Sequence, residues 1–149
     1  MSKLLGIGHV HLKVSNLRKA EKFYIKLLGF KVNERVNNYL FLTLGQKHHD
    51  LALQEIVNAK KPTENSIGLY HFAIEAKNLK ELASLYFKLK KEKIDVSPID
   101  HGISRALYFS DPDGNGIEIY VDSRNIRKKW KGLTKIIPEK EFKKLISKS

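Results

Sequence analysis

The chain contains no cysteine. This absence excludes disulfide bonds, thiolate metal sites and cysteine nucleophiles. It also has no apolar run long enough to span a bilayer. Its first residues, MSKLLGIGHVHLKV, lack the long apolar core and the small-residue cleavage site of a signal peptide. We therefore expect a cytoplasmic protein that does not associate with membranes.

Acidic residues are in short supply: 16 Asp and Glu stand against 28 Lys and Arg, for a net charge of +12. An excess of positive charge of this size is typical of proteins that bind nucleic acid. However, residues 123–149 alone carry ten basic and two acidic side chains. No aromatic platform or nucleic-acid motif accompanies this basic tail, so biased lysine usage and solubility explain it more simply. We therefore do not expect nucleic acid as a partner.

The 149 residues suffice for one domain or for two small subdomains that share a core. In the first part, Val10, Leu12 and Val14 alternate with His9, His11 and Lys13, as in a strand with one buried face. A helical pattern follows over residues 17–28, with Ser15 or Asn16 as its N-cap and Gly29 as its C-cap. Three more strands are predicted at 31–36, 39–44 and 50–56, which gives the order βαβββ.

The same order returns after the linker at residues 57–68. A strand is predicted at 70–76, a helix at 79–91, and strands at 96–99, 105–109 and 117–121. A shift of 62 residues places His9 on His71, Asn16 on Asn78 and Tyr24 on Tyr86. We interpret this match as an internal duplication.

Residues 123–149 fall outside the repeat. Trp130 is expected to fold back over a sheet edge. A short helix over Glu139–Ser147 is one interpretation of the end of the chain, with Phe142 on its apolar side, and a frayed or disordered segment is the other.

Glu118 stands between two isoleucines in the last predicted strand, so it points to the face opposite Ile117 and Ile119. Pseudo-twofold symmetry of the repeat would bring His9, His71 and Glu118 to one cavity. Two imidazoles and one carboxylate form a facial triad that suits Fe(II) or Mn(II) and leaves coordination positions open. Ala52, the repeat counterpart of Glu118, cannot bind a metal. Taken singly, each of these residues is more often structural or solvated.

Three stretches carry a resemblance to a known family: GHVHLKVSNLRKAEKFYIKLLGF, LYHFAIEAKNL and LYFSDPDGNGIEIY. Together they resemble the vicinal oxygen chelate superfamily over about residues 6–122. The resemblance implies an α+β fold in which two βαβββ modules form a curved, partly open mixed sheet around a metal cavity. The domain would comprise residues 1–122, with module one at about 6–56, module two at about 69–122, and the basic tail beyond it.

Within the superfamily, the chain is most similar to small catechol 2,3-dioxygenase-like proteins. His48-His49-Asp50-Leu51-Ala52-Leu53 resembles their HH-x-hydrophobic-Ala stretch, which implies that His49 acts as the acid/base. His101 resembles a group near the bound catecholate. Tyr108, four residues before Pro112, resembles a tyrosine that hydrogen-bonds a substrate hydroxyl.

The resemblance therefore implies an Fe(II)-dependent extradiol-type dioxygenase that acts on a catechol-like ring with O2, as a homodimer. Mn(II), Ni(II) or Zn(II) fit the same ligands. The alternatives are a glyoxalase-like lyase or isomerase, a fosfomycin-type thiol transferase, and a non-catalytic resistance protein that binds a small molecule. The sequence does not name the substrate.

Overall fold

The chain divides into two units in the computed structural model, which describes residues 3–147. The first unit comprises the residues up to Ile67 together with Asp111–Gly114. The second comprises Gly68–Ser110 together with the chain from Asn115 onward. Each unit has its own sheet, so we describe them separately.

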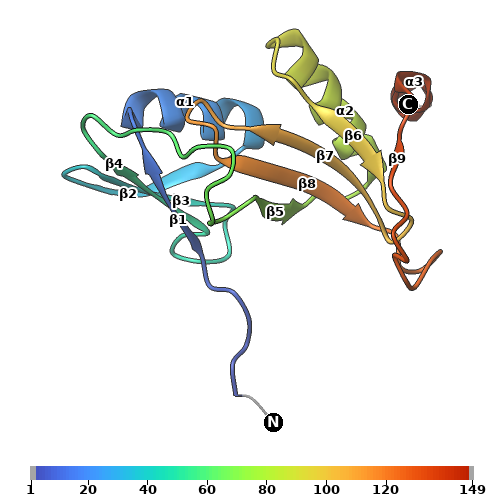
Figure 1. The fold of residues 1–149 in the computed structure, drawn as a ribbon, viewed down its shortest axis with the longest axis horizontal. Helices are drawn as coiled ribbons and strands as arrows, with labels where there is room; N and C mark the ends of the chain where they lie inside the picture. The colour runs from blue at the N-terminus through green and yellow to red at the C-terminus, as the bar shows by residue number, and fades with distance from the viewer. Residues whose placement is uncertain (1–2, 148–149) are drawn as a thin grey trace. The chain divides into compact units, whose positions relative to one another are not determined.

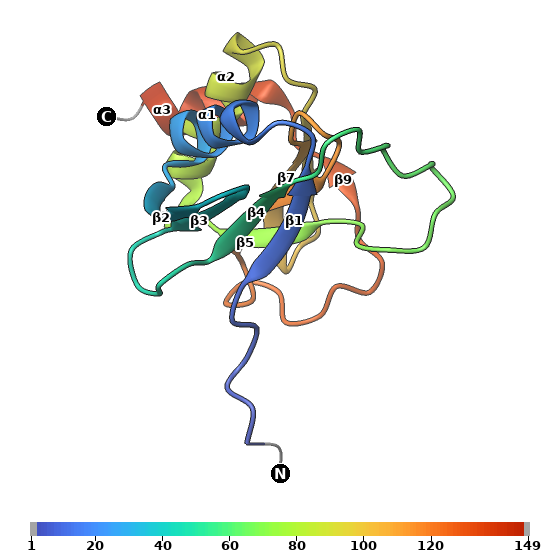
Figure 2. The ribbon, with the colours of Figure 1, turned by 90° about the vertical axis from the view of Figure 1, so that its left-hand side faces the viewer.

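The first unit contains one four-stranded sheet and one helix (Figures 1 and 2). The elements are β1 (Val10–Val14), α1 (Leu17–Leu28), β2 (Lys31–Val36), β3 (Tyr39–Thr43) and β4 (Leu51–Glu55). The strand order is β1-β4-β3-β2, with β1 parallel to β4 and the other pairs antiparallel. Helix α1 packs on β3 and β4 through the buried side chains Leu17, Ala20, Phe23 and Tyr24.

The ends of α1 lie where the sequence predicts them. Of the two predicted N-caps, Asn16 is the one used: its Oδ1 accepts a hydrogen bond from the Lys19 amide at 2.8 Å. Gly29 ends the helix with a φ of 75°, in the left-handed region that favours glycine. The helix is therefore fixed by its own flanking residues as well as by packing.

The second unit repeats this topology and extends it. Its elements are β5 (Phe72–Glu75), α2 (Leu79–Lys91), β6 (Ser97–Asp100), β7 (Ser104–Ser110), β8 (Gly116–Asp122), β9 (Lys135–Ile136) and α3 (Glu139–Ser147). The strand order is β5-β8-β7-β6-β9, and β5 is parallel to β8 as β1 is to β4. Neither mixed sheet is closed, which confirms the predicted α+β class with two βαβββ modules.

Part of the segment beyond Asp122 is folded into the second unit. Strand β9 pairs with the edge strand β6, so the edge-covering role expected of Trp130 belongs to β9. Helix α3 is the predicted helix, and its Phe142 is 1% exposed and stacks on Tyr86 of α2 at 4.6 Å between ring centroids. Over residues 3–147, no helix combines the length and apolar character needed to cross a membrane.

The turn Asp111–Gly114 is anchored in the first unit by two hydrogen bonds. The Tyr24 hydroxyl donates to Asp111 Oδ2 at 2.9 Å, and both residues are buried. The Ser15 amide donates to Asp113 Oδ2 at 3.0 Å. Burial, followed by the negative charge of Asp111, raises the pKa of Tyr24 above its usual value.

Tyr24→Phe should destabilise the protein by about 1–3 kcal/mol, because it removes a hydrogen-bond donor from a buried carboxylate. Urea denaturation measures the change. Tyr86→Phe is the matched control: the Tyr86 hydroxyl reaches Glu139 Oε2 at 3.3 Å in a less buried setting, so its loss should cost less. Equal effects in the two variants would contradict the special role of the Tyr24–Asp111 bond.

Candidate functional site

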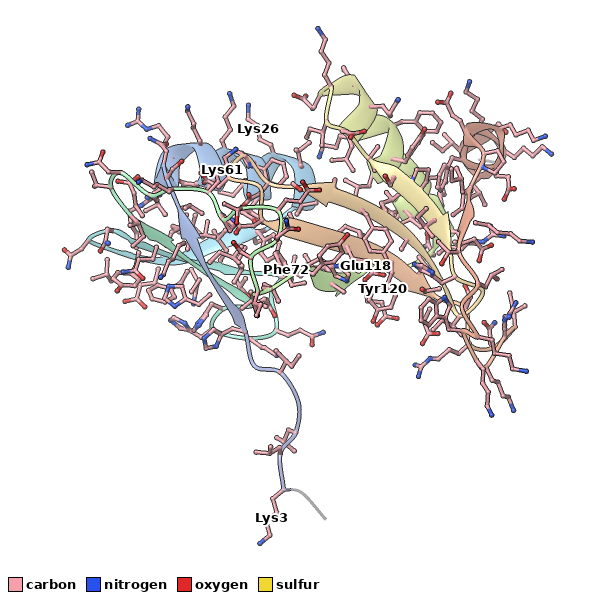
Figure 3. The ribbon with its side chains drawn as sticks, viewed as in Figure 1. Lys3, Lys26, Lys61, Phe72, Glu118 and Tyr120 are labelled. Carbon is pink, nitrogen blue, oxygen red and sulfur yellow. The ribbon has the colours of Figure 1, made fainter. Side chains whose placement is uncertain are left out.

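Glu118 lies in the middle of β8, on the face opposite Ile117 and Ile119. The two isoleucines are buried at 0% and 5% exposure, as the predicted alternation requires. The carboxylate points to the other face, beside the parallel strand β5 that carries Phe72 (Figure 3). Its side chain is only 13% exposed, and its Oε2 lies 3.0 Å from His71 Nε2. Two members of the predicted triad, His71 and Glu118, are thus in direct contact.

His71 immediately precedes β5, and Gly116 makes room for it. A Cβ at Gly116 would overlap the Tyr70 carbonyl oxygen and would lie 3.1 Å from His71 Cβ. The His71 ring also lies edge-on to Tyr108, with ring centroids 5.3 Å apart. Its Nδ1 is buried without a hydrogen-bond partner in the described part of the chain. Glu118 is therefore the polar group that orients this imidazole.

The separation of His71 Nε2 and Glu118 Oε2 fits two neighbouring ligands of one cation. Bonds of about 2.1 Å at a right angle place two ligand atoms about 3.0 Å apart, and the observed distance is 3.0 Å. Among residues 3–147, however, no three or more His, Cys, Asp or Glu side chains gather into a metal-holding group. The second unit thus supplies two of the three predicted ligands.

Tyr108 extends this pair along the sheet. It lies on β7 directly opposite Glu118 in the antiparallel register. Burial raises the pKa of Tyr108 above its usual value, and the negative charge of Glu118 and a hydrogen bond to it add to the effect. Tyr108 is therefore a protonated hydroxyl at neutral pH.

His101, just after β6, completes the array. Its Nε2 lies 3.0 Å from the Tyr108 hydroxyl oxygen, and its Nδ1 lies 3.0 Å from the carbonyl oxygen of Leu133. The ring is edge-on to Trp130, at 6.0 Å between centroids. His71, Glu118, Tyr108 and His101 thus form one continuous polar row across the second unit.

The other two predicted site residues lie together in the first unit. The rings of His9 and His49 are 4.4 Å apart between centroids, and Phe41 lies 5.1 Å from His49. Partial burial and the neighbouring His9 lower the pKa of His49 below its usual value. His48, in contrast, is 58% exposed and lies 3.2 Å from Glu34. Of the two adjacent histidines, His49 is the one that lies against His9.

Ala52 occupies the position in β4 that Glu118 occupies in β8. It pairs with His11 on β1 and with Phe41 on β3, and it is 2% exposed. The first module thus offers a buried methyl group where the second offers a carboxylate. That His9, His71 and Glu118 bind one metal, and that His49, His101 and Tyr108 are catalytic, stay predictions.

Sequence reasoning missed Trp130 and Leu133 as neighbours of His101. Trp130 is the only tryptophan in the chain, and it was assigned to a sheet edge. Leu133 acts through its backbone carbonyl, which has no sequence signature. The one available signal was Gly102, next to His101, whose lack of a side chain allows close packing.

Gly116→Ala should lower metal affinity by at least about 10-fold, which is the usual cost of disturbing the groups that position a metal ligand. The new Cβ would displace the Tyr70 backbone and move His71 away from Glu118. Titration with Fe(II) or Zn(II), followed by metal analysis, measures the loss. Gly68→Ala is the control, because a Cβ there meets no atom within 4 Å. Unchanged affinity in Gly116→Ala would contradict the placement of a ligand at His71.

Comparison with known proteins gives a family and several relatives. The sequence model of the Glyoxalase/Bleomycin resistance protein/Dioxygenase superfamily matches residues 6–119. Catechol-2,3-dioxygenase of Bacillus subtilis (strain 168) is 40% identical over 117 residues, which cover 78% of this chain and 41% of the relative. Glutathione transferase FosA of Serratia marcescens is 28% identical over 120 residues, 80% of this chain and 83% of the relative.

Among solved structures, lactoylglutathione lyase from Agrobacterium tumefaciens aligns with a TM-score of 0.63 at 22% identity. The alignment covers 80% of this chain and 96% of that one, and it shows a shared fold. The chain spans less than half the length of the Bacillus dioxygenase. With the match over residues 6–119 and two open βαβββ sheets, the chain belongs to the Glyoxalase/Bleomycin resistance protein/Dioxygenase superfamily.

Proposed function

We propose that the protein is a metal-dependent dioxygenase that opens the ring of a catechol-like substrate with O2. The observation that carries the proposal is the row His71–Glu118–Tyr108–His101, in which a candidate ligand pair adjoins a protonated hydroxyl and an imidazole. The 40% identity to a catechol-2,3-dioxygenase supports it.

His71 Nε2 and a Glu118 oxygen would hold the metal, with His9 as the third ligand that the repeat predicts. Bound there, Fe(II) would supply a Lewis acid for the two catechol oxygens and an open position for O2. The same ligands also accept Mn(II), Ni(II) or Zn(II). The identity of the metal as iron is therefore part of the proposal.

The chain's own groups would orient the substrate and move protons. The Tyr108 hydroxyl can donate a hydrogen bond to a substrate oxygen as negative charge develops there. His101 Nε2, at 3.0 Å from that hydroxyl, would accept the same hydrogen when no substrate oxygen is bound. His49, whose lowered pKa keeps it neutral at pH 7, can accept a proton and return it.

The test is oxygen uptake by protein loaded anaerobically with Fe(II), over a panel of catechols. We expect uptake with a yellow ring-opened product, and its loss in His9→Ala and Glu118→Ala. Absence of uptake from protein that holds one metal per chain would overturn the dioxygenase proposal.

A thiol transferase of the same fold is the second candidate, because FosA matches across 83% of its own length. Such an enzyme would turn over without O2. Transfer of glutathione to an electrophilic acceptor by the metal-loaded protein under anaerobic conditions, together with a lack of oxygen uptake on catechols, would favour it over the dioxygenase.

A further inference from the structure

The segment Arg127–Thr134 lies beyond the family match at residues 6–119, yet it contacts a predicted catalytic residue. We propose that this segment is a positioning element of the site: its Leu133 carbonyl fixes the tautomer of His101 and aims Nε2 at Tyr108. The inference rests on the proposed function for its effect on turnover, but the tautomer itself can be measured without activity.

A carbonyl oxygen can only accept a hydrogen bond. Because His101 Nδ1 lies 3.0 Å from the Leu133 oxygen, Nδ1 must carry the hydrogen of the neutral ring. Nε2 is then left with a free electron pair, 3.0 Å from the Tyr108 hydroxyl. The neutral imidazole is therefore an acceptor toward Tyr108, and the carbonyl enforces this role.

The direction matters because the Tyr108 hydroxyl has one hydrogen and two neighbours that accept it, Glu118 and His101. An imidazole with its hydrogen on Nε2 would compete as a donor and turn the hydroxyl toward Glu118. With the tautomer fixed, His101 remains available to accept from Tyr108 whenever the Glu118 oxygens are engaged elsewhere. The segment thus sets which way this hydroxyl can point.

The segment holds the carbonyl in place by its own hydrogen bonds. The Trp130 indole Nε1 donates to the same Leu133 oxygen at 2.5 Å, and the Leu133 amide donates to the Trp130 carbonyl at 3.2 Å. The Arg127 guanidinium donates to the carbonyl oxygens of Lys129 and Trp130, at 3.0 and 3.3 Å. The segment thus fixes the Leu133 carbonyl against His101 Nδ1 at 3.0 Å, and the Thr134 hydroxyl lies farther from the same nitrogen, at 3.4 Å.

Because Gly102 has no side chain, Arg127 and Leu133 of this segment can pack against the backbone beside His101. The φ of Gly102 is +75°, and a Cβ there would lie 2.5 Å from Arg127 Cδ and 2.9 Å from Leu133 Cδ2. An alanine at position 102 therefore forces the side chains of Arg127 and Leu133 to move, and we expect this shift to disturb the contact between the Leu133 carbonyl and the imidazole. Gly29 provides a matched control, since its φ is also +75° and no atom lies within 4 Å of its Cβ position.

The experiment is ¹⁵N NMR of the full chain labelled at histidine, with Zn(II) present as a diamagnetic ion. The His101 signals are identified by their absence in His101→Gln. We expect the neutral form of the ring to carry its hydrogen on Nδ1 in the unchanged protein. Gly102→Ala should lose this single state, and Gly29→Ala should retain it. Hydrogen on Nε2 in the unchanged protein would overturn the proposal, as would an intact tautomer in Gly102→Ala.

Trp130→Phe keeps the ring beside His101 but removes the indole N–H, so it serves if Gly102→Ala does not fold. It should loosen the tautomer and lower kcat on the best substrate by about 10-fold or more, with a smaller change in KM. A fixed tautomer and unchanged kcat in this variant would overturn the proposal. A protein with the Nδ1–H tautomer but no dioxygenase activity would disprove the proposed function and leave the positioning role intact.

Discussion

Glu118→Gln is expected to lower metal affinity more than about 100-fold and to abolish oxygen uptake. This loss exceeds the effect of removing a group that only hydrogen-bonds a metal ligand. The change keeps size and hydrogen-bonding capacity but removes the negative charge that a hard divalent cation requires. The Glu118 side chain is 13% exposed, and its Oε2 lies 3.0 Å from His71 Nε2. Water therefore has little access with which to replace the lost carboxylate as a ligand. Metal analysis after dialysis and the oxygen electrode measure the two effects.

Glu75→Gln is the matched control for this variant. Glu75 lies on the neighbouring strand β5, in register with Tyr120, and it is exposed. The same chemical change there should leave metal content and uptake near the unchanged level. Both variants should retain the melting temperature of the metal-free protein within a few degrees, since each amide can still form hydrogen bonds. A Glu118→Gln protein with one metal per chain would remove Glu118 from the ligand set.

The elements with a strong local pattern could be predicted closely. Helices α1 and α2 begin and end at the predicted residues, because apolar spacing and capping side chains lie within the helices or directly beside them. Glu118 could be assigned to the face opposite the core because period-two alternation fixes it. The symmetry of the repeat predicted that His71 and Glu118 would converge, and the structure brings these two side chains together.

The rest depends on contacts that have no local pattern. Strand β9 has two exposed residues and no alternation, so its pairing with β6 could not be foreseen. The partner of Tyr24 is Asp111, 87 residues away in a turn whose composition predicts only the turn itself. The contact between Leu133 and His101 is made by a main-chain carbonyl oxygen, which any residue at position 133 would supply. Long-range pairing and backbone groups set the limit of sequence reasoning here.

His49→Gln should lower kcat by about 10²–10⁴-fold while metal content stays unchanged, as loss of a positioned acid/base does. His49 lies with its ring 4.4 Å from that of His9, the predicted ligand, and 5.1 Å from Phe41. If His9 binds the proposed metal, His49 would lie beside it and could move a proton without being a ligand. Single-turnover oxygen uptake and metal analysis on the same sample separate the two effects.

His48→Gln provides the control at the adjacent position. His48 is more exposed, pairs with Glu34 and meets His49 through Nδ1 atoms 2.9 Å apart. A glutamine amide at position 48 can replace the hydrogen bond to His49 Nδ1. The kcat of His48→Gln should therefore fall by less than about 10-fold. If both variants lose activity equally, the pair acts as one structural unit. If only His48→Gln loses it, the acid/base belongs to the first histidine and the assignment from HHDLAL is wrong.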